Sequence, residues 1–492
     1  MITYSKKLRD IVSFLGLSSE SFSTLELDTD IFGITVESSK VKPGYLFAAL
    51  PGARTHGAHF VADAIDRGAV AILTDGEGVN LIKSALAVVS IDQVRECIGT
   101  LSSYFYDNPS ASLKVVAVTG TNGKTTVTSI LEYLWNRTGV SAGIIGTLGA
   151  RYLDGVESVF IPSTRTTPEA CELQAELALM RDSGVRAVAM EVSSHALSLH
   201  RVDGIHFALS LFTNLTQDHL DFHHSMEEYF EAKSTLFNSR FTDKALINID
   251  DPYGNRLFSQ SSIPAISIAN AESAHLGEWK ISSDSFEIID TEGRRFPIDS
   301  PLVGDFNRMN VAMALLAFVE TGGDLIQGIA LIREFPGVPG RLEQVGPGRP
   351  LILVDYAHTP DAVTRVLASL RPHTQGRIIA VLGCGGDRDP SKRPEMGRAL
   401  QTGADLAIAT SDNPRSEDPE AILDAMCGVG FQGVRIIDRR EAIAFAIDEA
   451  NDEDVVLIAG KGHEQGQESK GVVTPFDDRE VALEILATRG RS

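Results

Sequence analysis

Short apolar runs alternate with helical patterns along most of the chain, and polar turns separate them. A short apolar run bounded by such turns is typical of a buried strand, whereas apolar residues three or four apart mark one face of a helix. In the first two thirds of the chain the predicted strands are residues 32–36, 45–50, 69–74, 87–91, 142–145, 187–191, 207–213 and 245–249. This alternation predicts an α/β fold in which a mainly parallel sheet is covered by helices.

The last third of the chain contains five more strand candidates, at residues 351–354, 377–382, 406–409, 434–437 and 455–459. Each is followed at once by a polar loop, and ligands of open parallel sheets bind at the carboxyl ends of the strands. The loop GCGGDRD at residues 383–389 does not have the GxGxxG spacing of a dinucleotide site, so NAD is not inferred. We therefore expect a binding site for another ligand on these loops.

A chain of 492 residues is too long for one hydrophobic core, and the Pro- and Gly-rich stretch at residues 336–340 marks a boundary. We expect three domains: an N-terminal α/β domain at residues 1–98, a central parallel-sheet domain at residues 99–338, and a C-terminal Rossmann-like domain at residues 339–492.

The formal net charge of −22 argues against nucleic acid or an anionic membrane surface as the main partner. Four cysteines lie far apart without CxxC spacing, which is typical of reduced thiols in a cytoplasmic protein. The first 17 residues fit an amphipathic helix rather than a signal peptide, and no apolar run approaches the length of a membrane span. We expect a soluble, cytoplasmic protein that does not insert into membranes.

The most informative stretch is residues 115–126, where an apolar strand ends in the Gly-rich turn TGTNG and Lys124-Thr125-Thr126 opens a helix. Backbone N–H groups of such a turn, with the positive end of the helix behind them, bind phosphate. Lys124 can reach the β- and γ-phosphates, and the Thr125 hydroxyl can bind Mg²⁺. The spacing departs from the usual phosphate loop because Val118 stands at the position of its first Gly. The prediction is an ATP-binding central domain.

Two further strand ends carry candidate metal ligands. Glu191 follows a buried strand, where it would either bind Mg²⁺ or cap the next helix. The loop at residues 213–224 contains three His and two Asp, a composition that also fits zinc. Mg²⁺ fits better because a phosphate site needs a hard cation bound by oxygen. Of the three histidines, we expect only His219 at the site.

Other candidates are ambiguous when read locally. Lys233 lies in a helical run and reads as a solvated lysine. Asn307 opens a helix, where its amide could hold a nucleobase or serve only the helix terminus. Four basic residues lie on loops of the last third, and arginine there is suited to bind a carboxylate through two oxygens: Arg388, Lys392, Arg393 and Arg415.

Together these motifs resemble the Mur ligase family, ATP-dependent enzymes that form amide bonds in the peptidoglycan precursor. The matching segments follow in order across nearly the whole chain: TGTNGKTT (119–126), STRTTPE (163–169), MEVSSHAL (190–197), TNLTQDHLDFH (213–223), LVGDFNRMN (302–310), GVPGRLE (337–343), VDYAHTPDA (354–362), GCGGDRD (383–389), DNPRSE (412–417) and GKGHE (460–464). The DNPR motif is similar to that of members that add meso-2,6-diaminopimelate, whereas lysine-adding members lack its Arg.

The resemblance implies a ligase that adds meso-2,6-diaminopimelate to UDP-N-acetylmuramoyl-L-alanyl-D-glutamate through an acyl phosphate. Lys124, His219 and Lys233 would be catalytic, with Lys233 carbamylated. Two Mg²⁺ ions would be held by Thr125, Glu191, His219 and the carbamate of Lys233. The nucleotide would be bound by Gly120, Thr121, Asn122, Gly123, Lys124, Thr125, Thr126, Asn307, Arg341 and Asp355.

The resemblance also assigns the two other substrates. The UDP-sugar dipeptide would be held by Ser38, the loop at residues 53–55, Thr166, Thr167, Ser193 and Arg201. Diaminopimelate would be held by Arg388, Asp412, Asn413, Pro414, Arg415, Gly460 and Glu464. Arg415 would pair with the distal carboxylate, which lysine lacks. Three domains around a central cleft also suggest closure on the substrates, and we expect the enzyme to act as a monomer.

Some positions depart from the family pattern, and alternatives stay open. The N-terminal Asp-Ser-Arg signature is replaced by Glu37-Ser38-Ser39, and Leu199 stands where Gln is often found. The alternatives are a ligase that adds L-lysine or another diamine, a folylpolyglutamate synthase-like ligase, and a nucleotide-binding regulator without ligase activity. The DNPR and GKGHE loops argue against folylpolyglutamate synthase, and Arg415 argues against lysine.

Overall fold

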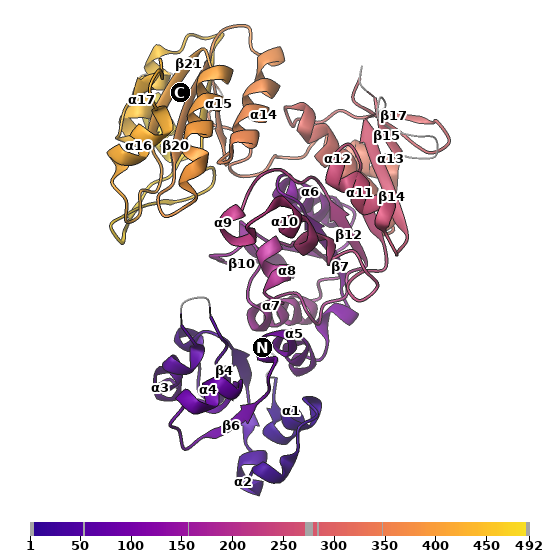
Figure 1. The fold of residues 1–492 in the computed structure, drawn as a ribbon. Helices are drawn as coiled ribbons and strands as arrows, with labels where there is room; N and C mark the ends of the chain where they lie inside the picture. Colours follow the sequence, from indigo (N-terminus) through magenta and orange to yellow (C-terminus); the bar gives the residue numbers. More distant parts are fainter. Residues whose placement is uncertain are drawn as a thin grey trace.

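The computed structural model describes residues 4–52, 55–155, 157–270, 279–282, 285–346 and 348–488. These residues form three main sheets of four, eleven and six strands, together with two small two-stranded sheets. Figure 1 shows the main sheets in chain order, with the N-terminal part below, the central part in the middle and the C-terminal part above it. The predicted α/β class with three sheet-forming parts is confirmed.

The first main sheet is parallel throughout and has the order β3-β4-β5-β6. Its strands match the predicted ones, apart from shorter ends in three of them: β3 (Gly33–Thr35), β4 (Tyr45–Ala48), β5 (Ala69–Thr74) and β6 (Ala87–Ser90). A small antiparallel pair precedes it, made of β1 (Lys6–Lys7) and β2 (Asp30–Ile31). The helices of this part are α1 (Leu8–Phe14), α2 (Thr24–Leu27), α3 (Val61–Asp66), α4 (Gly76–Leu81) and α5 (Val94–Phe105).

The eleven-stranded sheet has the order β10-β9-β8-β11-β7-β12-β13-β14-β15-β16-β17, and its seven strands from β8 to β15 are parallel. The parallel strands are β7 (Lys114–Thr119), β8 (Ala142–Gly146), β11 (Ala187–Glu191), β12 (Leu209–Phe212), β13 (Ala245–Asn248), β14 (Ala265–Asn270) and β15 (Trp279–Ile281). Antiparallel strands extend both edges: β9 (Gly149–Asp154), β10 (Glu157–Ile161), β16 (Glu287–Ile289) and β17 (Arg295–Pro297). The five parallel strands predicted from the sequence are confirmed, whereas β14, β15 and the four antiparallel strands were not predicted.

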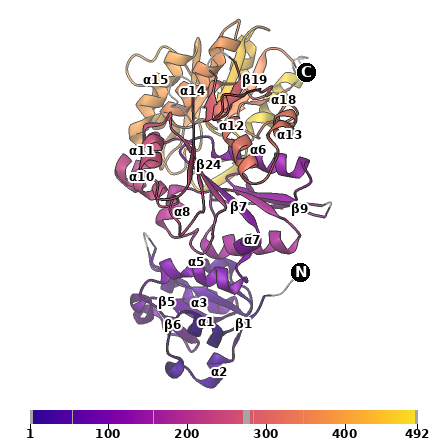
Figure 2. The ribbon, with the colours of Figure 1, turned by 90° about the vertical axis from the view of Figure 1, so that its right-hand side faces the viewer.

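Helices cover both faces of this sheet (Figure 2). They are α6 (Lys124–Arg137), α7 (Ala170–Asp182), α8 (Ser194–Ser198), α9 (Leu220–His223), α10 (Met226–Ser234), α11 (Pro252–Gln260), α12 (Asp305–Glu320) and α13 (Leu325–Ile332). Successive residues of β7 enter two different cores: Val115 and Ala117 pack in one, and Val116 and Val118 pack in the other. Because side chains alternate across a strand, burial on both faces explains the unbroken apolar run before the Gly-rich turn.

The six-stranded sheet has the order β18-β19-β23-β20-β21-β22, parallel except for the edge strand β18. Its strands are β18 (Glu343–Gln344), β19 (Leu351–Asp355), β20 (Ile378–Cys384), β21 (Leu406–Ser411), β22 (Val434–Arg435) and β23 (Val455–Ala459). Its helices are α14 (Pro360–Leu370), α15 (Arg393–Gly403), α16 (Pro419–Cys427), α17 (Arg439–Glu449) and α18 (Asp478–Thr488). A hairpin of β24 (Gly466–Ser469) and β25 (Val472–Pro475) lies outside the sheet. All five predicted strands are present, although β22 ends two residues before the predicted end.

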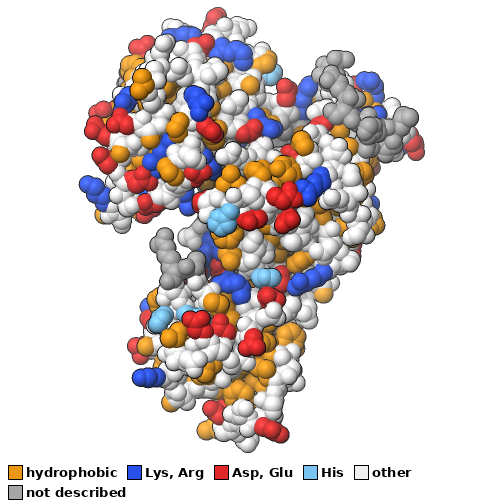
Figure 3. Space-filling model, in the orientation of Figure 1, with side chains coloured by type: hydrophobic (Ala, Val, Ile, Leu, Met, Phe, Trp, Pro, Cys, Tyr) orange, Lys and Arg blue, Asp and Glu red, His pale blue; other side chains and the backbone are white. Residues whose placement is uncertain are grey.

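Single turns of 3₁₀-helix join several elements: η1 (Ser19–Ser21), η2 (Ser38–Lys40), η3 (Gly57–Phe60), η4 (Pro109–Ala111), η5 (Arg371–His373) and η6 (Pro390–Lys392). Within the described residues, no helix is both long enough and apolar enough to cross a membrane. All four cysteines are free thiols, and three of them are buried. The space-filling view is hollowed on the side between the N-terminal and C-terminal parts (Figure 3).

Candidate functional site

The Gly-rich turn after β7 has a backbone that requires glycine at two positions. Gly120 and Gly123 have φ of +145° and +87°, in the left-handed region. A Cβ on Gly120 would lie 2.0 Å from the Thr213 hydroxyl oxygen, and one on Gly123 would lie 2.4 Å from the amide oxygen of Asn310. The turn is therefore held closely by its neighbours, with its N–H groups at the start of helix α6.

Lys124 is the first residue of α6 and folds back over this turn. Its ammonium donates hydrogen bonds of 2.9 Å to the carbonyl oxygens of both Gly120 and Thr121. Burial lowers the pKa of Lys124, and the Glu191 carboxylate partly offsets that effect. A bound phosphate would offer the ammonium stronger, charged acceptors than these carbonyls.

Thr125 and Glu191 meet directly behind the turn. The Thr125 hydroxyl donates to the Glu191 carboxylate over 3.1 Å, and the Arg341 guanidinium donates to the Thr125 hydroxyl over 3.2 Å. Both the backbone N–H and the hydroxyl of Thr147 also donate to Glu191, over 3.0 and 3.1 Å. Glu191 is 1% exposed and lies at the end of β11, so it does not cap the following helix, whose cap is Ser193. A hydroxyl and a buried carboxylate thus meet beside the phosphate turn.

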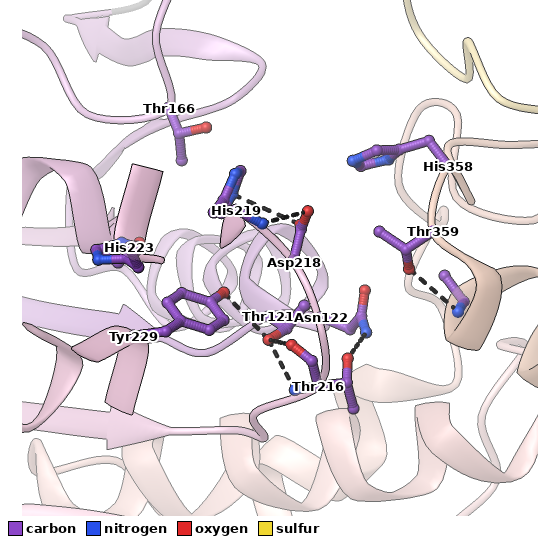
Figure 4. Close-up of polar contacts among 12 residues, drawn as sticks. Thr121, Asn122, Thr166, Thr216, Asp218, His219, His223, Tyr229, His358 and Thr359 are labelled. Carbon is purple, nitrogen blue, oxygen red and sulfur yellow. Dashed lines mark hydrogen bonds and ion pairs between the residues drawn. The ribbon is translucent and has the colours of Figure 1, made fainter. Parts of the chain in front are cut away.

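The loop after β12 brings Asp218 and His219 to the same cavity (Figure 4). Burial is the main cause that lowers the pKa of His219 to about 3, so its ring is neutral at pH 7. Asp218 accepts a hydrogen bond of 2.6 Å from Lys392, a residue of the C-terminal part. Although burial opposes ionisation, the neighbouring His219, His358 and Lys392 hold the pKa of Asp218 well below its usual range. An ion pair therefore joins the central loop to the C-terminal part.

The two other histidines of this loop have structural surroundings. His223 is buried, and its ring bonds the Ser194 hydroxyl over 2.8 Å. His224 is exposed and has a left-handed backbone at the end of α9. Neither of them lines the cavity that contains His219.

The local interpretation of Lys233 as a solvated lysine is wrong. Lys233 is 1% exposed, and its amine donates over 2.9 Å to the Gly120 carbonyl oxygen and over 3.4 Å to the Thr119 hydroxyl. Tyr229, one turn earlier on α10, places its ring 4.8 Å from this amine and bonds the Thr121 hydroxyl over 3.2 Å. The helix therefore packs this face against the phosphate turn. Burial, together with the charge of Lys124, holds the pKa of Lys233 well below its ordinary value.

A cavity of about 790 Å³ connects the phosphate turn with the third sheet. Its lining includes Lys124, Thr125, Glu191, Asn307, Arg341 and Asp355. Asn307 donates to the Val303 carbonyl oxygen and accepts from Asn310, so its amide also serves the start of α12. Asp355, at the end of β19, accepts hydrogen bonds from the N–H groups of Leu342 and Ala357. Apart from Gly120, the nucleotide residues named from the sequence thus line one cavity, with Thr126 on its wall.

Three of the residues assigned to the UDP-sugar dipeptide form one cluster next to Glu191. The Thr167 hydroxyl donates to the Glu191 backbone oxygen over 3.0 Å and to the Ser193 hydroxyl over 3.3 Å. Arg201 pairs with Glu169 over 2.8 Å and donates to the Thr167 backbone oxygen, while its Nε is buried without a protein partner among the described residues.

Thr166 and Ser38 have different positions from that cluster. Thr166 bonds the Thr147 hydroxyl over 3.1 Å, and it lines the 790 Å³ cavity. Ser38 begins η2 in the N-terminal part. Ala53 and Arg54 of the loop at residues 53–55 lie outside the described residues.

The residues assigned to the amino acid form a separate group on the loops of the third sheet. Asn413 donates to the Glu464 carboxylate over 2.8 Å. A Cβ on Gly460 would lie 2.8 Å from the buried Asp412 carboxylate, so these two loops approach closely. Arg415 donates over 2.6 Å to the Gly386 carbonyl oxygen, and its Nε lies 3.5 Å from the Glu468 carboxylate. Pro414, which lies between Asn413 and Arg415 in the sequence, is buried. Arg388 is exposed on the neighbouring loop.

Two further basic residues of these loops, Lys392 and Arg393, also have partners within the protein. Arg393 is 6% exposed and pairs with Glu417 over 2.8 Å, so it stabilises the loop. Lys392 pairs with Asp218, as described above.

Among the described residues, the lining of the 790 Å³ cavity does not include Arg415, Asn413 or Glu464. The nucleotide group and the amino-acid group are therefore separate in this structure.

Sequence reasoning missed Thr147, which contacts Glu191 twice. Thr147 directly follows β8, at the same sheet edge as the phosphate turn, so the rule applied to the other strand ends would have found it. Within the described ranges, no group of three or more His, Cys, Asp or Glu side chains has the arrangement of a metal site.

Three models of protein families match consecutive parts of the chain. They are the Mur ligase family, catalytic domain, at residues 30–106, the Mur ligase middle domain at residues 118–318, and the Mur ligase, glutamate ligase domain at residues 340–462.

Two curated relatives are similar over nearly their whole length. The UDP-N-acetylmuramoyl-L-alanyl-D-glutamate–2,6-diaminopimelate ligase of Streptomyces coelicolor is 44% identical, over 97% of this chain and 96% of its own. The protein of the same name from Gloeobacter violaceus is 41% identical, over 98% of both chains.

Solved structures agree with these matches. A structure of UDP-N-acetylmuramoyl-L-alanyl-D-glutamate–2,6-diaminopimelate ligase is 31% identical, covers all of both chains and has a TM-score of 0.65. FolC of E. coli, in complex with DHPP and ADP, is 19% identical over 80% of this chain and 93% of its own, with a TM-score of 0.59. That second likeness is one of fold alone.

Proposed function

The chain belongs to the Mur ligase family, and we propose that it joins meso-2,6-diaminopimelate to UDP-N-acetylmuramoyl-L-alanyl-D-glutamate with consumption of ATP. Relatives named for this reaction are 41–44% identical over nearly the whole chain. The observation that carries the proposal is the pairing of a phosphate turn, with Thr125 and Glu191 behind it, and a separate group around Arg415 suited to a carboxylate.

The proposed reaction has two steps. A carboxylate oxygen of the D-glutamyl residue (its γ-carboxylate) attacks the γ-phosphorus of ATP, which forms an acyl phosphate and releases ADP. The neutral amine of diaminopimelate then attacks the acyl carbon, the C–O bond to phosphate breaks, and the amine loses a proton to solvent. Net, one ATP is converted to ADP and phosphate for each amide bond. An acyl phosphate reacts with water, so the site must exclude it.

Lys124 and the turn act on the nucleotide in this proposal. The ammonium exchanges the carbonyl oxygens of Gly120 and Thr121 for phosphate oxygens, and the N–H groups at residues 123–126, where α6 begins, bind the same phosphates. Asn307, Arg341 and Asp355 line the same cavity and hold the rest of the nucleotide. Fixed positive groups around the γ-phosphate stabilise the charge that develops during transfer.

The residues present fit Mg²⁺. The Thr125 hydroxyl, the Glu191 carboxylate and the neutral ring of His219 line one cavity, and hydroxyl and carboxylate oxygens are ligands that this cation prefers. Two ions fit the proposal, with Thr125, Glu191, His219 and a modified Lys233 as their protein ligands. When bound, Mg²⁺ neutralises charge on the phosphate oxygens. The phosphates of ATP would supply further oxygen ligands.

We propose that Lys233 carries a carbamate. The amine that reacts with CO₂ must be neutral, and the pKa of Lys233 lies well below its ordinary value because of burial. Addition of CO₂ forms an N–C bond and releases one proton, which converts a buried amine into an anionic oxygen ligand. The proposal is supported by the position of the unmodified amine, which lies against the phosphate turn and donates to Gly120 and Thr119.

The two remaining substrates follow the groupings described above. Ser38, Thr166, Thr167, Ser193 and Arg201 hold the UDP-sugar dipeptide in this proposal, and the buried Arg201 Nε is a donor that a substrate oxygen can satisfy. Diaminopimelate is held by the loops of the third sheet: Arg388, Asp412, Asn413, Pro414, Arg415, Gly460 and Glu464. The acidic side chains bind its ammonium group, and Arg415 binds its distal carboxylate.

We also propose that the three parts act as domains with the boundaries 1–98, 99–338 and 339–492, and that the enzyme works as a cytoplasmic monomer. Each part has its own sheet, and each candidate group is built within the single chain. The nucleotide and amino-acid groups are separate here, so the C-terminal domain has to move toward the central one for amide formation. Lys392 and Asp218 already connect the two.

The test is phosphate release from ATP in parallel reactions that contain Mg²⁺ and bicarbonate, with the UDP-sugar dipeptide plus meso-diaminopimelate or L-lysine, or with a folate plus L-glutamate. Release that depends on both the dipeptide and diaminopimelate supports the proposal. Release with lysine alone would make the protein a lysine-adding ligase. Release that needs a folate and glutamate would favour a folylpolyglutamate synthase-like activity, and nucleotide binding without release under any condition would favour a regulator.

A further inference from the structure

We propose that Lys461 is a positioning residue for the amino-acid site: its ammonium fixes Asn413, Glu464 and the β24–β25 hairpin in the arrangement that binds diaminopimelate. This inference rests on the proposed function and extends it to a residue that does not itself contact substrate. The contacts of Lys461 join the GKGHE loop to the DNPR loop, and these two loops follow different strands of the third sheet, β23 and β21.

Lys461 is 0% exposed, which is unusual for lysine because burial of an unpaired ammonium is costly. Its Nζ donates three hydrogen bonds, to the Asn413 amide oxygen over 3.2 Å, to Glu464 Oε2 over 3.1 Å and to the Gly466 carbonyl oxygen over 2.7 Å. An ammonium has three protons, so every donor of Lys461 is used inside the protein. The charge therefore organises the loops and is not available to a ligand.

The first consequence concerns the orientation of the Asn413 amide. Its oxygen accepts from Lys461 and from the Glu468 N–H over 2.9 Å, while its nitrogen donates to Glu464 Oε2 over 2.8 Å. Because lysine is only a donor, it requires the amide oxygen on its side. The nitrogen is thereby directed at Glu464, and its second proton is left for a substrate.

The second consequence concerns Glu464. Within the part of the chain that the structure describes, both hydrogen bonds to its carboxylate use Oε2, one from Asn413 and one from Lys461. The side chain is 33% exposed, so its other oxygen, Oε1, is the one that can meet the ammonium of an amino acid. Lys461 thus holds the carboxylate in one direction without covering it.

The third consequence concerns the hairpin. The bond from Lys461 to the Gly466 oxygen fixes the first residue of β24. Further along the hairpin, the Arg415 N–H donates to the Glu468 oxygen over 3.0 Å, and the Lys470 N–H donates to the Arg415 oxygen over 2.6 Å. Lys461 therefore also acts on Arg415, because it holds strand β24, and β24 bonds the Arg415 backbone.

Arginine would not replace lysine at this position. The three acceptors surround one nitrogen, which suits a compact ammonium, whereas a guanidinium is planar and spreads its donors over three nitrogens. Methionine has a similar length and fills the same space without a charge. The Lys461→Met variant therefore removes the three hydrogen bonds with little change in volume, and Lys461→Gln retains one short amide donor.

The experiment measures KM for diaminopimelate and for ATP, kcat, and thermal unfolding of the full-length wild type, Lys461→Met and Lys461→Gln. Arg377→Met is the matched control: it removes a cation paired with the buried Asp454 next to β20, away from the amino-acid group. We expect both Lys461 variants to raise KM for diaminopimelate at least ten-fold and to leave KM for ATP within two-fold. The control should change stability but neither KM.

The outcomes separate the two proposals. Wild-type protein that releases no phosphate with diaminopimelate overturns the proposed function and this inference with it. Active wild type with Lys461 variants whose KM for diaminopimelate is unchanged, or rises together with KM for ATP, overturns the inference alone. If both Lys461 variants fail to unfold cooperatively while Arg377→Met folds, the residue serves stability rather than the site, and the inference is again overturned.

Discussion

Replacement of Arg415 by alanine should weaken binding of diaminopimelate while leaving ATP binding nearly unchanged. Arg415 is bound to the Gly386 carbonyl oxygen over 2.6 Å, so its guanidinium already has a fixed direction before substrate arrives. Its backbone has φ of +51°, in the left-handed region. Alanine also has a Cβ, so the variant has the same backbone cost and the comparison isolates the side chain.

The expected size follows from the environment of the guanidinium. A hydrogen bond to a charged group contributes about 1.5–3 kcal/mol. The side chain is 23% exposed and its Nε lies 3.5 Å from Glu468, so solvent and this carboxylate both reduce the gain from a substrate carboxylate. We take about 2 kcal/mol, which corresponds to roughly a 30-fold rise in KM for diaminopimelate.

The assay is phosphate release at saturating ATP and dipeptide, with diaminopimelate varied, followed by the same measurement with ATP varied. Arg435→Ala is the control, because Arg435 is a surface residue of the same part of the chain that pairs with Asp424. It should change neither KM. If Arg415→Ala raised both KM values equally, or neither, the assignment of Arg415 to the distal carboxylate would be refuted.

Three further predictions concern buried ionisable side chains. Lys233→Ala should lower kcat by roughly 10²–10³-fold. Wild-type activity should fall in CO₂-free buffer and return when bicarbonate is added. Wild-type activity that does not depend on CO₂ would contradict the carbamate. Burial raises the pKa of Glu176 from 4.5 to about 8, so the proton it binds stabilises the folded state below pH 4.5 and that stabilisation is lost as pH rises through 8. Glu176→Gln should therefore flatten the decline of Tm between pH 5 and about pH 8, and parallel curves for variant and wild type would count against this. Arg439 and Asp478 form an ion pair with neither side chain exposed. Arg439→Met should therefore lower the free energy of unfolding of the C-terminal part by about 3–5 kcal/mol, measured by urea unfolding. The double variant Arg439→Met/Asp478→Leu should recover most of this loss.

The parallel cores of the sheets could be predicted because their strands are buried on both faces. The run before the Gly-rich turn is apolar at every position, since its alternate side chains enter two different cores. The edge strands lack this signal. In the edge strand β10, for example, no residue is fully buried. Edge strands pair through backbone groups that carry little trace in side-chain pattern.

For the site, sequence reasoning found residues whose chemistry is local and missed those whose role comes from burial. Thr125 and Glu191 were predicted from strand ends, and they meet as expected at one sheet edge. Lys233 was read as solvated because helical periodicity does not reveal what packs against each face. Lys461 was not singled out, although it lies inside a motif already recognised. Two of its three acceptors are near it in the sequence, but Asn413 is 48 residues away, and only the fold brings that amide to Lys461.

The choice of amino acid is best measured by mass spectrometry of the product formed from ATP, the UDP-sugar dipeptide, and equal concentrations of meso-diaminopimelate and L-lysine in one reaction. We predict a UDP-linked tripeptide whose mass corresponds to the addition of diaminopimelate, because lysine would leave Arg415 without a carboxylate partner. A product that carries lysine in equal or larger amount would contradict it.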